Sequence, residues 1–179
     1  LLERNILGKN ILITGAGGSI GSELSRQIMK LSPNKVVLMD NSEFNLYNIH
    51  FELSTKGFSI EIIPSLCTVT NYHQLKQVIS NNDVHTIYHA AAYKHVPMVE
   101  MNVVSGSYNN VIGTYNVAKL ADKLGVENMV LVSTDKAVRP TNVMGASKRM
   151  SELILQAYSD KSECCFSMVR FGNVLESAG

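Results

Sequence analysis

Two adjacent residues, Asp135 and Lys136, place a carboxyl group beside an amine directly after the apolar run Asn128–Ser133. Such a pair can donate and accept protons in one reaction if a rigid strand end holds both side chains toward a substrate. An Asp-Lys dipeptide is also an ordinary pair for a surface turn. Its place after a strand of an α/β sheet favours the catalytic interpretation, because ligands bind at the carboxyl ends of such strands.

A glycine-rich segment near the start of the chain, Thr14–Gly21, reads TGAGGSIG. It stands between a short β-branched run and a helical pattern, which is typical of dinucleotide-binding loops. Gly15 would allow a tight turn, Gly18 would let backbone N–H groups approach a pyrophosphate, and Gly21 would let the helix pack closely on the sheet. The phosphates would then lie at a helix N-terminus, which favours negative charge. The alternative is a glycine-rich turn without a ligand.

Asp40 ends the second apolar run, about 20 residues after Gly21, where a carboxylate that binds the adenosine ribose is expected. A carboxylate there would repel a 2′-phosphate, and the segment DNSE that it begins has no Lys or Arg. We therefore expect NAD as the cofactor, with NADP as the alternative. Asp40 could instead cap the helix that follows it.

Apolar runs alternate with helical patterns along the whole chain. The sequence predicts strands over residues 10–14, 35–40, 59–63, 84–92, 128–133 and 164–171, and helices over 19–31, 42–57, 71–82, 103–124 and 145–159. Six short strands separated by helices indicate an α/β fold whose parallel sheet is covered on both faces. Right-handed crossovers then favour a doubly wound Rossmann fold with strand order 3-2-1-4-5-6, so that residues 1–179 form one dinucleotide-binding domain.

The composition fits a globular chain: 179 residues, 45% apolar, 17% charged, with a net charge of +1. This charge gives no reason to expect nucleic acid or an anionic membrane as partner. The three cysteines have no metal-ligand or redox spacing, so we expect no metal site and a reducing, cytoplasmic location. No apolar run reaches the length of a membrane helix, so any membrane attachment would come from segments outside this chain.

Several blocks of the sequence resemble the extended short-chain dehydrogenase/reductases and, among them, the nucleotide-sugar 4,6-dehydratases that act on UDP-N-acetylglucosamine in polysaccharide and glycan biosynthesis. The blocks are TGAGGSIGSEL, DNSEFNLYNIHFEL, HAAAYKHVPMVE, NNVIGTYNVA, STDKAVRPTNVMGASKRMSE and RFGNVL. They cover nearly the whole chain. The chain stops where this family begins its sugar-nucleotide-binding part, so we expect that part to be largely absent.

The resemblance implies a lyase that oxidises C4 of the sugar, removes the C5 proton, expels the C6 hydroxyl as water and returns the hydride to C6. It implies that Asp135 protonates the leaving hydroxyl, that Lys136 takes the C5 proton, and that Thr134 binds near the C4 oxygen. An amine base suffices because a C4 ketone makes the C5 proton acidic. Lys148 would bind the nicotinamide ribose.

The resemblance also implies two sets of binding residues. The cofactor set is Gly15, Gly18, Ser19, Ile20, Gly21, Asp40, Asn41, Ser42, Thr68, Val69, Ala90, Ala91, Ala92, Asn110 and Lys148. The substrate set is Lys94, His95 and Asn173, near the sugar and its diphosphate. Within the first set, Thr68 and Val69 would flank the adenine. A homo-oligomer is expected, and the long helical patterns after the fourth and fifth strands could form its interface or could equally be ordinary core helices.

Met144 departs from the Tyr-x-x-x-Lys pattern of the larger enzyme group, because it stands where the tyrosine is expected before Lys148. The segments at Tyr72 and Tyr115 read Tyr-x-x-x-Lys, but both lie on predicted helices away from the ligand edge, so we interpret them as packing residues. Methionine cannot titrate. The C4 proton would go to Asp135, to Lys136, or to Lys148 through water. A sugar-nucleotide 4-epimerase and a non-catalytic NAD(P)-binding regulator are the alternative functions.

Overall fold

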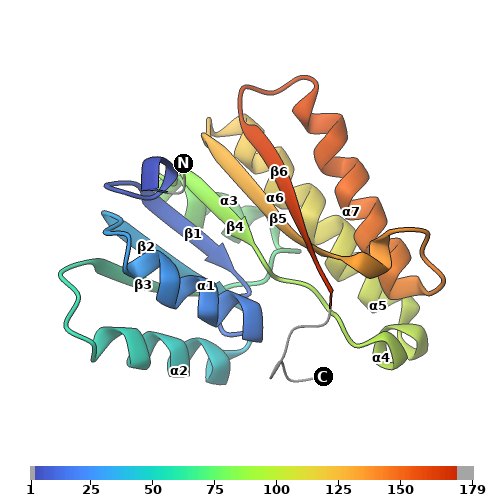
Figure 1. Cartoon of the computed structure of the whole chain (residues 1–179), viewed down its shortest axis with the longest axis horizontal. Coiled ribbons are helices and arrows are strands. Elements are labelled where there is room, and N and C mark those ends of the chain that lie inside the picture. Colours follow the sequence, from blue (N-terminus) through green and yellow to red (C-terminus); the bar gives the residue numbers. More distant parts are fainter. Residues whose placement is uncertain (1–2, 173–179) are drawn as a thin grey trace.

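A computed structural model describes residues 3–172, and six parallel strands form its centre (Figure 1). The strands are β1 (Asn10–Thr14), β2 (Lys35–Asp40), β3 (Glu61–Leu66), β4 (Thr86–His89), β5 (Asn128–Thr134) and β6 (Cys165–Phe171). Their order across the sheet is β3-β2-β1-β4-β5-β6, and every neighbouring pair is parallel. The predicted doubly wound Rossmann fold and its strand order are therefore confirmed.

Helices link successive strands and cover both faces of the sheet (Figure 1). The α-helices are α1 (Ser19–Met29), α2 (Glu43–Ser54), α3 (Tyr72–Asn81), α4 (Val96–Met101), α5 (Val103–Ser107), α6 (Gly113–Lys123) and α7 (Val143–Ser159), with short turns η1 (Glu3–Asn5), η2 (Tyr108–Ile112) and η3 (Asp135–Ala137). Residues of α1 and α2 build one core cluster, and residues of α3, α6 and α7 build the other. Within residues 3–172, none of the helices is both long and apolar enough to cross a bilayer.

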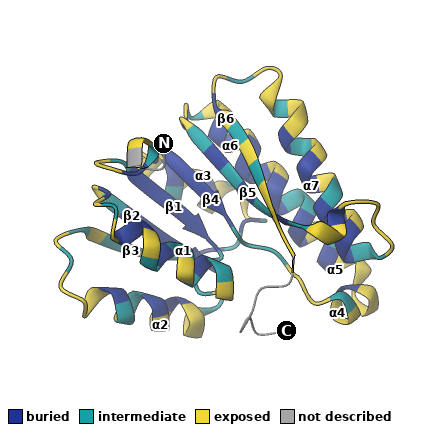
Figure 2. Ribbon diagram, in the orientation of Figure 1, coloured by how far each residue is buried: buried dark blue, intermediate teal, exposed yellow. Residues whose placement is uncertain are grey.

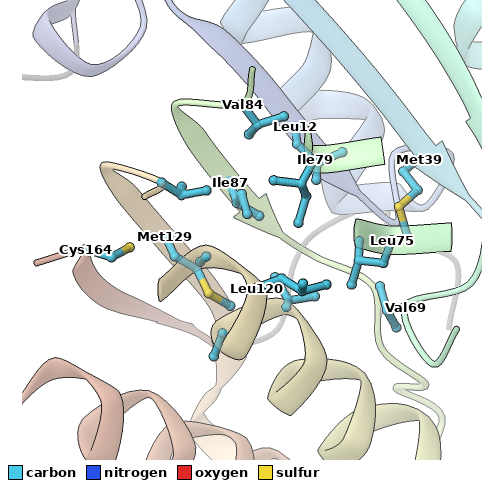
Figure 3. Close-up of a cluster of buried hydrophobic side chains, with 14 of the residues drawn as sticks. Leu12, Met39, Val69, Leu75, Ile79, Val84, Ile87, Leu120, Met129 and Cys164 are labelled. Atoms are coloured by element: carbon cyan, nitrogen blue, oxygen red, sulfur yellow. The ribbon is translucent and has the colours of Figure 1, made fainter. Parts of the chain in front are cut away.

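Alternate residues of the central strand β1 serve the two cores. Ile11 and Ile13 face the α1 and α2 side, whereas Leu12 faces the side of α3 and α6, where it joins Leu75 and Leu120 (Figure 3). All of these side chains are fully buried, and the central strands are buried on both faces (Figure 2). Burial of each such side chain contributes roughly 1.5–3 kcal/mol, so the two cores fix the strand ends against the helices that follow them.

Strand β3 differs from its predicted range of 59–63, because it runs over Glu61–Leu66 and includes Pro64. The sequence reads Pro-Ser at that point, which resembles the end of a strand. A proline is tolerated here because β3 lies at the edge of the sheet, where a missing N–H costs no ladder hydrogen bond on the outer side. The strand therefore continues three residues further toward the ligand edge.

The helix predicted over 103–124 is divided in the structure. A π-helical turn, η2, separates α5 from α6, and the short helix α4, which the sequence did not predict, precedes α5. A π turn places one extra residue in the helical repeat and is often found at functional sites. It directs Asn109 and Asn110 inward, and both are buried.

Candidate active site

The carboxyl ends of β1, β4, β5 and β6 open into a cleft of about 970 Å³. A smaller hollow of about 180 Å³ lies beside it, at the ends of β2 and β3, and shares Gly15, Gly18 and the loop after β4 with the cleft. The chain reverses its strand order between β1 and β4, and this switch point is where doubly wound sheets bind ligands. Among residues 3–172, no group of three His, Cys, Asp or Glu side chains could hold a metal ion.

The glycine loop after β1 forms a cradle, and a side chain at Gly15 or Gly21 would clash with the neighbouring backbone. Gly15 adopts φ of +68°, and a Cβ there would lie 2.7 Å from the Ala91 backbone. A Cβ on Gly21 would overlap the Gly15 carbonyl, so α1 packs directly on the loop. Gly18 is the N-cap of α1 and supplies no side-chain hydrogen bond to the first-turn N–H groups, which lack partners within the helix. Ser19 and Ile20 continue this lining, and the cradle fits an anionic group such as a pyrophosphate.

Asp40 braces the glycine loop against the start of α2. Its Oδ2 accepts a hydrogen bond of 2.9 Å from the Gly17 N–H, and its Oδ1 accepts one of 2.9 Å from the Ser42 N–H. Asp40, Asn41 and Ser42 all line the smaller hollow. Asp40 thus binds the N–H of the N-cap residue, whereas Ser42 itself caps α2 through its hydroxyl, which accepts from the Asn45 N–H at 3.3 Å. Because each carboxylate oxygen can accept a second hydrogen bond, the ribose contact stays a prediction beside these contacts.

Thr68 and Val69 also line the smaller hollow. The Thr68 hydroxyl is 2.9 Å from that of Thr70, which turns the chain after β3. Val69 is buried under α6, since a Cβ on Gly113 would lie 2.6 Å from its Cγ2, and Asn116 donates a hydrogen bond of 3.1 Å to its carbonyl. The two residues present a rigid, mostly apolar wall, which suits a flat ring.

The loop after β4 borders both openings, and Asn110 holds it. Ala90, Ala92 and the predicted substrate residues Lys94 and His95 line the large cleft, while Ala91 lines the small hollow.

The Asn110 amide is buried behind this loop and lines neither opening. Its Oδ1 accepts a hydrogen bond of 2.8 Å from the Tyr93 N–H, and its Nδ2 donates to the Tyr93 carbonyl and to the Ser147 hydroxyl, both at 3.0 Å. Asn110, which we predicted to bind the cofactor, therefore acts on the loop that borders the cofactor site.

A buried histidine that the sequence analysis missed, at the end of β4, links the end of β1 to helix α6. His89 Nδ1 lies 2.7 Å from the Thr14 hydroxyl, and Nε2 lies 3.1 Å from the Thr114 hydroxyl. Thr114 donates to the Asn110 carbonyl, so its oxygen accepts from His89 Nε2–H, and His89 Nδ1 accepts from Thr14. Burial, with a smaller contribution from the Lys148 charge, lowers the pKa of His89 to about 3, so the ring is neutral.

The candidate acid–base pair lies in the turn η3, at the end of β5. The Thr134 hydroxyl accepts from the Lys136 N–H at 3.3 Å and donates to Asp135 Oδ1 at 3.0 Å. Thr134 and Lys136 line the cleft. The Asp135 side chain is 59% exposed and does not line the cleft. Its Oδ2 lies beside Gly172, which is a cleft-lining residue. The Thr134 hydroxyl, then the Lys136 charge, lower the pKa of Asp135. The predicted substrate residue Asn173 lies outside the described residues.

Lys148 lies on α7 and reaches the same cleft. Its side chain is 7% exposed, and its Nζ donates a hydrogen bond of 2.6 Å to the Val132 carbonyl. Burial lowers the pKa of Lys148 to about 8, against the opposing charge of Glu152. Met144 lies one turn earlier and is buried in the cleft wall. The start of α7 packs on the acid–base turn, because a Cβ on Gly145 would overlap the Lys136 carbonyl.

The two other Tyr-x-x-x-Lys segments have no part in this cleft. Neither Tyr72 nor Tyr115 lines an opening, and the Lys119 ammonium lies 5.6 Å and 5.4 Å from their ring centroids. Lysine over an aromatic face is a packing arrangement. Tyr72 packs against the core as predicted, whereas Tyr115 is 39% exposed and its ring centroid lies 6.4 Å from that of Tyr158.

Comparison with known proteins agrees with this geometry. Residues 11–179 match the sequence profile of the family described as polysaccharide biosynthesis protein. The chain is 47% identical to the capsular polysaccharide biosynthesis protein CapD of Staphylococcus aureus, over 100% of this chain and 30% of that protein. It is 34% identical to a UDP-N-acetylglucosamine 4,6-dehydratase (inverting) of Campylobacter jejuni, over 96% of this chain and 51% of that protein.

A solved structure, Pen from Bacillus thuringiensis, superposes with a TM-score of 0.89 at 31% identity, over 97% of this chain and 53% of that one. The chain thus spans about half or less of the length of these relatives. The predicted resemblance to the nucleotide-sugar dehydratases of the extended short-chain dehydrogenase/reductase group is confirmed at the level of the family. The chain belongs to the polysaccharide biosynthesis protein family.

Proposed function

We propose that residues 1–179 form the dinucleotide-binding and acid–base part of a nucleotide-sugar 4,6-dehydratase, a lyase that acts on UDP-N-acetylglucosamine. The observation that carries this proposal is the placement of Thr134, Lys136 and Lys148 in one cleft with the glycine loop. Elimination of water needs an acid and a base that are fixed side by side, and the η3 turn holds Asp135 and Lys136 in that way.

The residues present fit a nicotinamide dinucleotide. The glycine cradle suits the pyrophosphate, and the hollow between Asp40 and Val69 suits the adenosine end. The Asp40 carboxylate disfavours a 2′-phosphate, so we propose NAD rather than NADP. When bound, the nicotinamide supplies a site that accepts the C4 hydride and returns it to C6. Lys148, with its Nζ fixed on the Val132 carbonyl, would orient the ribose beside it.

The protons are then moved by the residues of the η3 turn. Asp135 is held ionised by Thr134 and Lys136, so it must take up a proton before it can protonate a leaving hydroxyl. The C4 hydroxyl releases a proton during oxidation, and we propose that Asp135 receives it and passes it to the C6 hydroxyl, which leaves as water. The Lys136 side chain takes the C5 proton as a neutral amine, and its ammonium, whose protons exchange with solvent, donates a proton to C5 after hydride return to C6. The net reaction is loss of one water molecule from the substrate. It requires no tyrosine at the position of Met144.

The decisive experiment is turnover of UDP-N-acetylglucosamine in heavy water by the full-length protein, followed by NMR of the sugar. A 4-keto-6-deoxy product that carries deuterium at C5 is expected. An unlabelled 4-epimer would instead favour the epimerase, which needs a proton acceptor that Met144 does not provide. A protein that binds NAD but leaves the sugar unchanged would favour the regulator.

A further inference from the structure

Glu152, on α7, is a fully buried carboxylate that no step of the proposed reaction uses. It accepts four hydrogen bonds. Its Oε1 accepts from the Ser133 hydroxyl at 2.7 Å and from Arg170 Nε at 2.8 Å, and its Oε2 accepts from Arg170 Nη2 at 2.7 Å and Arg149 Nη1 at 2.9 Å. Arg170 contributes most to lowering the pKa of Glu152 to about 2, so the group is ionised.

These hydrogen bonds join the elements that carry the candidate chemistry. Ser133 directly precedes Thr134, the N-cap of the acid–base turn η3, and Arg170 precedes Phe171, which lines the cleft. Glu152 itself stands one helical turn after Lys148. One carboxylate thus connects the ends of β5 and β6 to the helix that supplies the third candidate residue.

The carboxylate is buried, but the Arg149 and Arg170 side chains are 38% and 41% exposed, so these ion pairs are partly solvated and give little net stability. Their fixed geometry is the more specific consequence. Four charge-assisted or hydroxyl hydrogen bonds leave the carboxylate one orientation, and through Ser133 they fix the end of β5.

We propose that Glu152 is a positioning residue that holds the Thr134–Lys136 turn in register with Lys148. The expected loss of kcat rests on the proposed function, whereas the expected loosening of the turn does not. Displacements of about 1 Å at reacting groups can cost about 100-fold in rate, so a loosened turn should lower kcat while substrate affinity changes little.

The chain contains a control pair of the same hydrogen-bond geometry, although the Glu52 side chain is 34% exposed and that of Glu152 is fully buried. Arg26 and Glu52 form the same two-pronged pair, with Nε to Oε1 at 2.9 Å and Nη2 to Oε2 at 2.8 Å, and Lys56 joins Glu52 as Arg149 joins Glu152. This pair joins α1 to α2, and none of its members lines either opening. Glu52→Gln therefore removes a like pair without touching the cleft.

The test compares Glu152→Gln with Glu52→Gln in the full-length protein. Hydrogen exchange should become faster in the segment 132–138 of Glu152→Gln only, and kcat should fall at least about tenfold with KM within about twofold. Ser133→Ala removes the hydrogen bond from Ser133 to Glu152 but keeps both arginines, and it should also give faster exchange in 132–138. If Glu152→Gln does not fold, the result for Ser133→Ala decides between the outcomes. Equal exchange in 132–138 for Ser133→Ala, Glu52→Gln and wild type would overturn the inference. Absent turnover in wild type would defeat the proposed function alone, since the exchange comparison still applies.

Discussion

The ammonium of Lys136 lies 3.4 Å from Asp135 Oδ1, and the same oxygen accepts the Thr134 hydroxyl. The acid and the base are thus in contact before any substrate arrives. Both side chains are largely exposed in this structure, so their attraction adds little to stability. The contact instead keeps the carboxylate ionised and able to receive the C4 proton, whereas the Lys136 ammonium must lose a proton before it can act as the base.

Replacement of Lys136 by alanine should abolish elimination and leave cofactor binding intact. The amine is the group that takes the C5 proton in the proposed reaction, and it lies in the turn after β5, whereas the glycine cradle follows β1. Turnover measured by NMR should fall by at least about 100-fold, the lower range for loss of a general base. NAD affinity by calorimetry should stay within about twofold. A loss of NAD affinity would mean that Lys136 contacts the cofactor instead.

Alanine at Gly18 and at Gly21 should separate cofactor binding from folding. A Cβ at Gly18 meets only the Gly15 carbonyl, at 3.4 Å, and its φ of −74° suits any residue, so Gly18→Ala should fold. Its methyl group would occupy the helix N-terminus and should weaken NAD binding at least about tenfold. Gly21→Ala would force a side chain into the Gly15 backbone and should not fold stably.

Gly57→Ala is the control for both variants. Gly57 has φ of +72° with open space around it and lines neither opening, so alanine there should cost about 1 kcal/mol of stability through backbone strain alone. Melting temperature and NAD titration distinguish the three cases. Gly18→Ala that binds NAD like wild type would show that the phosphates do not lie on this cradle.

The exposed apolar side chains of α4 and α5 bear on the predicted homo-oligomer. Met101 is 79% exposed and Val104 is 82% exposed, and Met150 and Leu153 on α7 are also exposed. Helices α4 and α5 both pack on α7, so these residues belong to one region of the surface. We predict that Val104→Glu reduces the oligomer to a monomer in sedimentation velocity, while Leu7→Glu, an exposed site before β1, has no effect. A wild-type monomer would contradict the prediction.

The fold and the site residues in the loops after the strands could be predicted, because the sequence patterns that indicate them are local. Each predicted loop residue follows an apolar run of a strand, and parallel strands bring such positions to one edge. Gly15, Asp40 and the Thr134–Lys136 turn therefore fell at the carboxyl edge as expected. Helix α4 and the π turn were missed, because short helices and an extra residue in a turn depend on what they pack against rather than on periodicity.

His89 and Glu152 could not be found from the sequence for a different reason. His89 pairs with Thr14, 75 positions away, and Glu152 pairs with Ser133 and Arg170, 19 and 18 positions away, across separate elements. A histidine that ends a short apolar strand and a glutamate within a helix are both common, and only their burial makes them notable. A local sequence pattern does not show whether a residue is buried by an element that is distant in the sequence.

The buried neutral His89 should make stability depend on pH in a defined window. Its pKa is about 3 in the folded protein and near 6.5 when unfolded, so between these values the unfolded chain binds one more proton. Stability contributed by the neutral ring is therefore complete above pH 6.5 and is lost as pH falls, by up to about 1.4 kcal/mol per pH unit. The lowered pKa values of Glu52 and Glu152 act only below about pH 4.5. Among these three groups, only His89 therefore changes the stability between pH 6.5 and pH 5.

Urea denaturation at pH 7, 6 and 5 would measure this effect in wild type and in His89→Asn, whose amide can keep one of the two hydrogen bonds. The variant should be less stable at pH 7, since a buried hydroxyl loses its partner. Its stability should fall less steeply toward pH 5 than that of wild type, because it has no ring to protonate on unfolding. Parallel pH profiles would show that the ring is not held neutral between Thr14 and Thr114.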